Sequence, residues 1–360
     1  MDLTLPTTNQ DKICEFEWPK LLTKVISGTN LTFSEAYSAM NALLSKNVSE
    51  IVAGGFLVAL RAKVESVQEM AGMASAMIDF ALPLEYPGDL LDTCGTGGDQ
   101  KHTVNISTMA AIVAASAGLK VAKHGNRAAS SKSGSADVLE YLGVKIDLGP
   151  QGVAACIERA NLGFCMAPKF HGAMANVGPV RRALAVPTVF NFLGPLVNPA
   201  RAKYQIVGVF DPTMLNTMAQ VLGMLGSKHA LVVHAADGYD ELSTTSTNMV
   251  IELKRSSDGD VTFDEYLLDP RSFGFDPCDP VELEGGDAVF NAEILLAVFS
   301  GKHGPVRDIV LLNSGAALYV GGGAPSITAG IAQAATLIDS GAANRTLYEL
   351  IETSNSVNIN

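Results

Sequence analysis

Hydrophobic residues in the first 80 positions of the chain recur every three or four residues, which is the spacing of amphipathic helices. Two capping boxes, Thr32-x-x-Glu35 and Ser66-x-x-Glu69, mark the expected starts of two helices, the first of them over 33–44. A row of methionines follows the second box at helical spacing, and we interpret it as core packing. The row consists of Met70, Met73 and Met77. The N-terminal segment is therefore predicted to be helical throughout.

From residue 90 onward, short apolar runs alternate with helical segments and end at glycines. The runs predicted to be strands are 90–94, 119–122, 144–148, 204–210 and 230–234. The segments predicted to be helices are 109–117, 136–142 with Ser135 as its cap, 214–225, 306–319 and 327–340. This alternation predicts a parallel sheet covered by helices. Residues 248–263 contain the turn sequence Ser-Ser-Asp-Gly and predict an antiparallel hairpin.

The two patterns predict an α/β protein of two parts. Prolines and a glycine over 83–88 break the chain between them. We expect a small all-helical domain over 1–85, joined by part of 165–195. A large α/β domain with a mainly parallel central sheet is expected over 86–352. Residues 353–360 are expected to form a frayed tail.

Composition narrows the class of protein. The five cysteines form no Cys-x-x-Cys pair, which favours reduced thiols over a zinc site or a disulfide framework. The formal net charge of −12 disfavours generic nucleic-acid binding, because such binding needs a basic surface. No apolar run reaches the roughly 18–20 residues of a membrane span, and residues 1–12 have no signal-peptide core. We therefore expect a cytoplasmic protein with no nucleic-acid or membrane partner.

The sequence Gly95-Thr96-Gly97-Gly98-Asp99 is the most informative local pattern. It follows a predicted strand and precedes a helix start, where backbone N–H groups and the helix dipole can receive an anion. Its glycines allow a ligand to approach the backbone closely. It is neither a P-loop, since no Gly-Lys-Ser/Thr follows, nor a dinucleotide fingerprint, since Gln100 stands where a third glycine would be needed. Taken alone, the cluster is equally consistent with a structural turn.

Neighbouring polar segments favour a ligand site at this glycine cluster. Asn105-Ile106-Ser107-Thr108 places small polar side chains at a helix start, and Lys123-His124-Gly125-Asn126-Arg127 follows the next predicted strand. Serines and a lysine crowd 130–135. These segments leave the C-terminal edge of a parallel sheet, where α/β proteins bind ligands. Hydroxyls, amides and cations that converge there suit a phosphorylated sugar.

Four motifs in this chain resemble those of the anthranilate phosphoribosyltransferase family, and the match runs from about residue 6 to about residue 340. The motifs are Asp92-Thr-Cys-Gly-Thr-Gly-Gly-Asp99, Asn105-Ile-Ser-Thr-Met-Ala-Ala111, Lys123-His-Gly-Asn-Arg-Ala-Ala-Ser-Ser131 and Asn191-Phe-Leu-Gly-Pro-Leu-Val-Asn-Pro199. The resemblance implies a nucleoside phosphorylase-like fold, a homodimer and a magnesium-dependent glycosyltransferase of tryptophan biosynthesis. That enzyme would transfer the phosphoribosyl group of phosphoribosyl pyrophosphate (PRPP) to the amine of anthranilate.

The resemblance also implies which residues bind each ligand. Those implied for magnesium are Ser107, Asp240 and Glu241, and those for anthranilate are Gly95, Asn126 and Arg181. Those implied for PRPP are Gly95, Gly98, Asp99, Thr103, Asn105, Ile106, Ser107, Thr108, Lys123, His124, Gly125, Asn126, Arg127, Ala128, Ala129, Ser130, Ser131 and Ser135. No general base is assigned, because an aromatic amine is already nucleophilic when neutral.

Elementary chemistry supports these roles and leaves alternatives open. Adjacent carboxylates suit Mg²⁺, which prefers oxygen ligands and bridges to phosphates, but Asp240-Glu241 is also compatible with a solvated acidic turn. An arginine grips a carboxylate with two parallel hydrogen bonds, a role open to Arg181 or to its neighbour Arg182. His124 and His171 are candidates for proton carriers, for anthranilate contacts or for structural histidines.

The chain departs from the commonest family pattern at Gln100-Lys101-His102, where shorter residues including glycine are common.

Three rival functions also have to be weighed. A pyrimidine nucleoside phosphorylase of the same fold is disfavoured by the motifs at 123–127 and 191–199. A non-catalytic relative that binds nucleic acid is disfavoured by the net charge and by the Asp240-Glu241 pair. A scaffold with degenerate sites is disfavoured by the completeness of the motifs.

Overall fold

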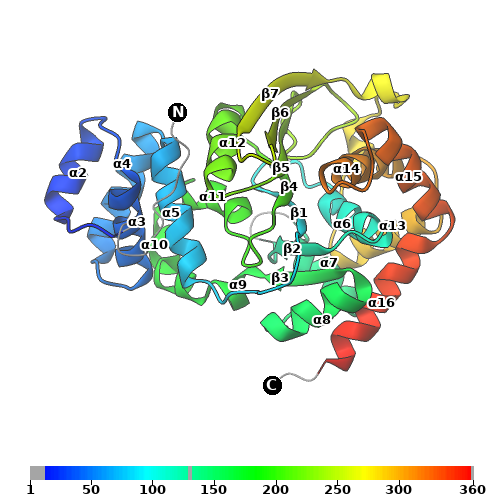
Figure 1. The fold of residues 1–360 in the computed structure, drawn as a ribbon, viewed down its shortest axis with the longest axis horizontal. Coiled ribbons are helices and arrows are strands. Elements are labelled where there is room, and N and C mark those ends of the chain that lie inside the picture. The colour runs from blue at the N-terminus through cyan, green and yellow to red at the C-terminus, as the bar shows by residue number, and fades with distance from the viewer. Residues whose placement is uncertain (1–12, 129–131, 358–360) are drawn as a thin grey trace.

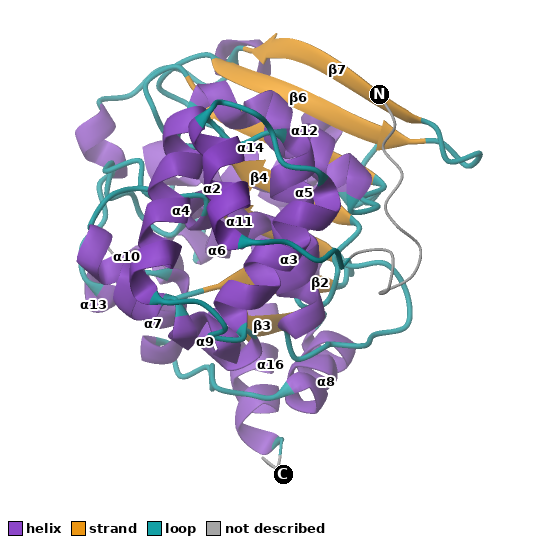
Figure 2. Ribbon diagram, turned by 90° about the vertical axis from the view of Figure 1, so that its left-hand side faces the viewer, coloured by secondary structure: helices purple, strands orange, loops and turns teal. Residues whose placement is uncertain are grey.

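The computed structural model describes residues 13–128 and 132–357, and within them seven strands form one sheet in the order β3-β2-β1-β4-β5-β6-β7 (Figure 1). The strands are β1 (Leu91–Gly95), β2 (Val121–Gly125), β3 (Leu162–Met166), β4 (Tyr204–Gly208), β5 (His229–Ala235), β6 (Asn248–Arg255) and β7 (Val261–Leu268). The first five are parallel, and β6 and β7 add an antiparallel hairpin at one edge (Figure 2). The predicted mainly parallel sheet and its hairpin are confirmed.

The sheet separates two hydrophobic cores, because successive strand residues point to opposite faces. Leu231 of β5 faces one core, whereas Val232, the next residue, faces the other. The helices on the first side are α6 (Ile106–Ser116), α7 (Ser135–Tyr141), α8 (Pro150–Ala160), α13 (Ala288–Phe299), α14 (Pro305–Val320), α15 (Ile327–Asp339) and α16 (Ala342–Ser356). Those on the second side include α5 (Val67–Phe80), α11 (Phe190–Leu193) and α12 (Leu215–Met224).

The N-terminal helices continue the second core away from the sheet (Figure 1). They are α2 (Trp18–Ile26), α3 (Phe33–Leu44) and α4 (Glu50–Lys63), together with α5. Both predicted capping boxes are present, at Thr32 and at Ser66. The methionine row of α5 is buried, which confirms its interpretation as core.

A later segment of the chain returns to these N-terminal helices. It contains the short helices α9 (Ala167–Phe170), η1 (Gly172–Asn176) and α10 (Gly178–Leu184). Helix α10 packs against α4, and the Asn176 side chain donates a 2.7 Å hydrogen bond to the Leu44 carbonyl at the end of α3. Residues from the middle of the sequence therefore share the N-terminal core.

The strand predicted over 144–148 is wrong, and β3 occupies the position next to β2 instead. The alternation that suggested a strand is real, because Val144, Ile146 and Leu148 are buried. The segment pairs with no strand, however, because side chains of α16 bond to its backbone. Ser354 accepts a hydrogen bond from the backbone N–H of residue 145, and Asn355 donates one to the carbonyl of residue 143.

Two predicted helix boundaries and the predicted start of the C-terminal tail also require correction. Helix α6 begins at Ile106, three residues before the predicted start, so Ser107 and Thr108 lie in its first turn. The cap of α7 is Gly134, whose N–H is held by the Asp137 carboxylate, so Ser135 is the first helical residue rather than the cap. Helix α16 continues to Ser356, so residues 353–356 are helical and are not part of a frayed tail.

Two glycines within helices should respond oppositely to replacement by alanine. A Cβ on Gly330 of α15 would collide with the backbone carbonyl of Gly315 in α14, whereas one on Gly55 of α4 would have no atom within 4 Å. We expect Gly330→Ala to destabilise the protein by about 1–3 kcal/mol because the helices must separate. Gly55→Ala should stabilise it by about 0.5–1 kcal/mol through helix propensity. Denaturant unfolding of both variants measures this, and equal effects would contradict the packing argument.

Candidate functional site

Two adjacent glycines shape the C-terminal edge of the sheet. Gly95 ends β1 and Gly208 ends β4, and the two are partners in the strand register. A Cβ on Gly95 would collide with the Asp240 carboxylate, and one on Gly208 would collide with the Asp240 backbone carbonyl. Both positions therefore require glycine because Asp240 lies directly across the ends of these two strands.

The glycine loop after β1 is tied to this carboxylate and to β4. Gly97 and Gly98 have φ angles of 64° and 81°, in the left-handed region that favours glycine. The Gly97 N–H donates a 2.6 Å hydrogen bond to Asp240 Oδ2. The Thr96 N–H donates to the Gly208 carbonyl at 2.9 Å. The loop is thus held across the strand ends, while Gly97 and Gly98 stay exposed to solvent.

Three carboxyl groups gather beneath this loop, contributed by Asp99, Asp240 and Glu241. Burial raises the pKa of Asp240, and the neighbouring Asp99 carboxyl, which is hydrogen-bonded to it, raises that pKa further. Burial and the charge of Asp240 likewise raise the pKa of Glu241. Like charges at close range disfavour ionisation of both groups. A divalent cation would relieve this repulsion.

The donor set around Ser107 fits magnesium. The Glu241 carboxylate accepts a hydrogen bond from the Ser107 N–H at the start of α6, which places it beside the Ser107 hydroxyl. Among the described residues, no three His, Cys, Asp or Glu side chains form a complete metal-binding group. Mg²⁺ does not need one, because it retains waters and takes one or two carboxylates together with substrate phosphates. The oxygens present therefore match its chemistry.

Lys123 is buried under the site. Its side chain is almost fully enclosed, and its ammonium donates to the Thr93 carbonyl at 2.6 Å and to the Ser107 hydroxyl at 3.3 Å. Its charge lowers the pKa values of Asp92 and of Glu241, against the raising effect of burial. Lys123 therefore acts as an internal counterion between two acidic groups and is not the surface lysine that its residue type would suggest.

Asp92 and Asn198 are structural residues to which the sequence analysis assigned no role. Asn198 donates hydrogen bonds to Asp92 Oδ2 at 2.7 Å and to the Ala122 carbonyl at 2.8 Å. The backbone N–H of His124 donates to Asp92 Oδ1 at 3.1 Å. Asn198 therefore joins β1 to β2 under the site. The only signal in the sequence was the presence of both residues within long motifs.

The start of α6 is anchored by another unpredicted residue, Asn291 of α13. Its side chain donates a 2.9 Å hydrogen bond to Asn105 Oδ1, and Asn105 donates in turn to the Ser133 carbonyl at 3.3 Å. Thr103 forms an isolated β-bridge with Glu284. The loop before α6 is thus attached to the segment that leads into α13. Nothing in the local sequence indicated these distant partners.

The loop after β2 turns back onto α7. The Asn126 carbonyl accepts hydrogen bonds from the Ser135 hydroxyl at 3.3 Å and from the N–H of residue 136 at 3.1 Å. Arg127, predicted to bind PRPP, instead pairs with Asp137 at 3.0 Å and with Glu140 at 2.7 Å. The predicted residues Ala129, Ser130 and Ser131 lie outside the described residues.

Two buried histidines lie side by side behind the site, with ring centroids 5.2 Å apart. His171 Nε2 bonds to the Val197 carbonyl at 2.9 Å, and His124 Nδ1 bonds to the Gly194 carbonyl at 3.2 Å. Burial, reinforced by His171, lowers the pKa of His124 to about 3, so its imidazole is neutral. Because Nδ1 must carry the proton, Nε2 is an acceptor, and it has no hydrogen-bond partner among the described residues.

Arg181 is distinguished from Arg182 by its surroundings. Its guanidinium lies 5.1 Å from the centroid of the Phe190 ring, in a cation–π contact, and burial lowers its pKa. Arg182 is exposed. Within the described part of the chain, no carboxylate pairs with Arg181. A half-buried, unpaired guanidinium is suited to a carboxylate ligand.

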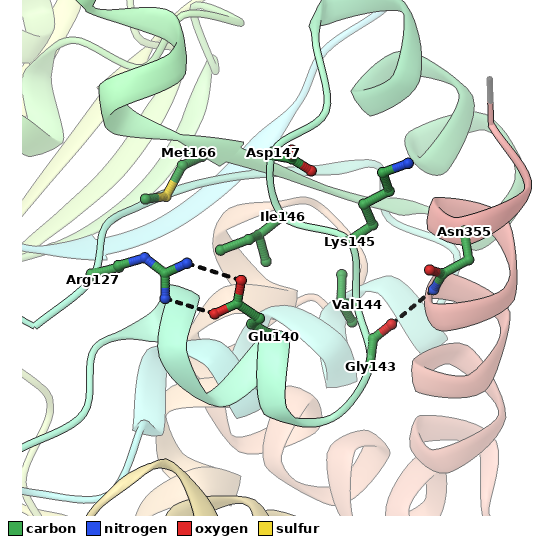
Figure 3. Close-up of a pocket in the computed structure, with 9 residues that line it drawn as sticks. All are labelled: Arg127, Glu140, Gly143, Val144, Lys145, Ile146, Asp147, Met166 and Asn355. Carbon is green, nitrogen blue, oxygen red and sulfur yellow. Dashed lines mark hydrogen bonds and ion pairs between the residues drawn. The ribbon is translucent and has the colours of Figure 1, made fainter. Parts of the chain in front are cut away.

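A cavity of about 470 Å³ lies beside this site and not within it (Figure 3). It opens between the end of α7, the extended segment 143–147 and Asn355 of α16. Of its described lining residues, Arg127 alone was predicted to bind a substrate, and Figure 3 shows that residue paired with Glu140. The cavity therefore does not correspond to the carboxylate cluster or to the glycine loop.

Comparison with known proteins agrees with this architecture. Residues 87–344 match the a/b domain of the glycosyl transferase family, and residues 19–81 match its helical bundle domain. Anthranilate phosphoribosyltransferase from Chromobacterium violaceum is 46% identical over 92% of this chain and 96% of its own length. That from Thermoanaerobacter sp. is 48% identical over 91% of this chain and 96% of its own length.

Solved structures show the same similarity. The anthranilate phosphoribosyltransferase of Thermus thermophilus superposes with a TM-score of 0.87 at 43% identity, over 93% of this chain and 99% of that one. The Saccharomyces cerevisiae enzyme in complex with PRPP and Mg has a TM-score of 0.84 at 27% identity, over 94% and 98%. The class is thus that of two-domain glycosyl transferases, with a helical bundle and an α/β domain. Within it, the chain belongs to the anthranilate phosphoribosyltransferase family.

Proposed function

We propose that this chain transfers the phosphoribosyl group of PRPP to the amine of anthranilate. The products are N-(5-phosphoribosyl)anthranilate and pyrophosphate, and the reaction belongs to tryptophan biosynthesis. The observation that carries the proposal is the Asp240 carboxylate held against the glycine loop at the end of β1. The family relatives support the same reaction, since each of those described above carries the name of this enzyme.

PRPP binds, in this proposal, along the loops after β1 and β2. Backbone groups of Gly95, Gly98 and Asp99 and the start of α6 face the phosphates, where a helix N-terminus favours an anion. The remaining PRPP residues are those that the family resemblance implied. For Arg127 the role requires the side chain to leave its ion pairs with α7, so we assign its backbone rather than its guanidinium. Lys123 contributes through the Ser107 hydroxyl that it orients.

Magnesium is held, in this proposal, by Ser107, Asp240 and Glu241. The yeast relative was solved with PRPP and Mg, which supports the metal requirement. When bound, the cation neutralises charge on the pyrophosphate leaving group. The protein's own contribution is to keep the carboxylates together at the strand ends, against their mutual repulsion.

Anthranilate is gripped by Arg181, with Gly95 and Asn126 alongside. The guanidinium presents two parallel donors to the carboxylate of anthranilate, and the Phe190 ring holds it in place. This orientation brings the neutral amine toward the anomeric carbon of PRPP, which develops positive charge as pyrophosphate leaves. Alignment of the two substrates supplies the rate enhancement, so no general base is assigned.

Ligand class, localisation, oligomeric state and domain organisation are also part of the proposal. A yeast relative bound to 4-fluoroanthranilate supports binding of an anthranilate-like ligand. We infer a cytoplasmic homodimer with a helical domain over 1–85 and an α/β domain from residue 86, as the sequence predicts. None of the helices in the described ranges is long and apolar enough to span a membrane.

The proposed reaction is tested by anthranilate fluorescence over time with purified protein, PRPP and Mg²⁺. We expect the signal to fall only when all three components are present, because the amine is consumed. Folded protein that leaves the fluorescence unchanged would contradict the proposal. Phosphorolysis of thymidine or uridine, or a gel shift at physiological salt, would then identify one of the rival functions.

Replacement of Arg181 should affect anthranilate selectively. We expect Arg181→Ala to raise the KM for anthranilate roughly 10- to 100-fold, because a charge-assisted bidentate contact is lost. The KM for PRPP should change little. Arg182→Ala is the matched control, since that neighbouring guanidinium is exposed. Steady-state kinetics with each substrate varied would refute the assignment if both variants behaved alike.

Removal of the two proposed metal carboxylates should abolish the response to magnesium. For Asp240→Asn combined with Glu241→Gln, we expect kcat/KM to fall by roughly two orders of magnitude or more at ordinary Mg²⁺. Thermal stabilisation by Mg²⁺ with PRPP should also disappear. Asp258→Asn, in the exposed turn between β6 and β7, controls for loss of charge. Full activity of the double variant would exclude the metal role.

A further inference from the structure

The segment Gln100-Lys101-His102, where this chain departs from the commonest family pattern, has a constrained backbone. Gln100 and His102 have φ angles of 59° and 53°, a region that costs free energy for residues other than glycine. Hydrogen bonds hold them there. The Lys101 N–H donates to Asp99 Oδ1 at 3.1 Å, and the His102 carbonyl accepts from the Gly285 N–H at 2.7 Å. The loop therefore fixes the direction in which the Lys101 side chain leaves the backbone.

That direction is toward Gly238 and Tyr239, the two residues that precede Asp240 in the chain. The Lys101 ammonium lies 5.4 Å from the centroid of the Tyr239 ring, and its Cε lies 3.3 Å from the position of a Cβ on Gly238. Tyr239 immediately precedes Asp240 and is buried. Lys101 is thus at the rim of the carboxyl cluster.

Of the other cations in the two loops, Lys123 and Arg127 already have partners, and Lys132 is exposed to solvent. Lys123 is enclosed and bonded to a carbonyl and a hydroxyl, and Arg127 is paired with two carboxylates of α7. Lys101 is half-buried and, among the described residues, makes no ion pair. A cation–π contact at a partly exposed position is weak. The ammonium can therefore exchange it for a stronger partner at small cost.

We propose that Lys101 is a pyrophosphate-binding residue of this chain, and that its ammonium leaves the Tyr239 ring to contact the pyrophosphate group of PRPP. The proposal rests on the proposed function for the identity of the substrate. The compact ammonium on a flexible stem suits a phosphate oxygen as a point charge. Lys101 adds a positive charge beside the carboxyl groups of Asp99, Asp240 and Glu241.

Titration calorimetry with inorganic pyrophosphate and Mg²⁺ tests the proposal directly. We expect Lys101→Met to weaken pyrophosphate binding roughly tenfold or more, since a charge-assisted contact is lost. The KM for PRPP should rise by a similar factor, while the KM for anthranilate stays the same. Lys101→Arg, which keeps the charge and the cation–π contact, should remain within roughly threefold of the unmodified protein. Lys302→Met, a distant exposed lysine, should have no effect.

Each alternative result has a distinct meaning. Unchanged pyrophosphate binding by Lys101→Met would overturn the proposal. Equal losses in Lys101→Met and Lys101→Arg would also overturn it, since the side chain would then matter for packing on Tyr239 and not for charge. If the unmodified protein binds no pyrophosphate, Lys101 has no such role. If it binds pyrophosphate through Lys101 but never consumes anthranilate, the proposed reaction fails and the pyrophosphate site stands.

Discussion

The Lys123 ammonium lies buried between β1 and α6, where it bonds to the Thr93 carbonyl and the Ser107 hydroxyl. A buried cation is tolerated only where opposite charges and hydrogen bonds replace its hydration. Asp92 on one side and Glu241 on the other supply those charges. The lysine thereby fixes two features at once: the hydroxyl proposed to bind magnesium, and the carboxylate beside it. Removal of that single charge would leave the two buried carboxyl groups uncompensated.

A steric constraint complements this electrostatic one. Gly95 and Gly208 leave room for Asp240 to cross the strand ends, and the Gly97 N–H then bonds to its carboxylate. Residues far apart in sequence are thus brought together by the absence of two Cβ atoms and by one hydrogen bond. The same arrangement forces carboxyl groups close enough to raise their pKa values. A divalent cation bound there would relieve the repulsion between them.

The sequence predicted the fold class correctly, and it proposed a region for the site, because both predictions depend on local patterns. Capping boxes, apolar runs and glycine turns each consist of residues that are close together in the sequence. The sequence could not predict hydrogen-bond and ion-pair partners that meet only in the folded protein. The run 144–148 alternates like a strand, yet Ser354 and Asn355 of α16 take its backbone hydrogen bonds. Arg127 lies in a motif predicted to bind PRPP, yet α7 presents carboxylates to it. Composition and spacing do not indicate which residues that are far apart in the sequence will contact each other.

The residues proposed to bind the two substrates are supported by different hydrophobic cores. This division affects how the reacting atoms are aligned. Phe190, which holds Arg181, belongs to the core shared with the N-terminal helices. The β1 and β2 loops are supported by α6 and α13, which belong to the core on the opposite face. The proposed amine donor and the proposed phosphoribosyl donor therefore rest on separately packed bodies joined through the sheet. Any small rotation between those bodies changes the distance from the amine to the anomeric carbon, so alignment is set by packing remote from the reacting atoms.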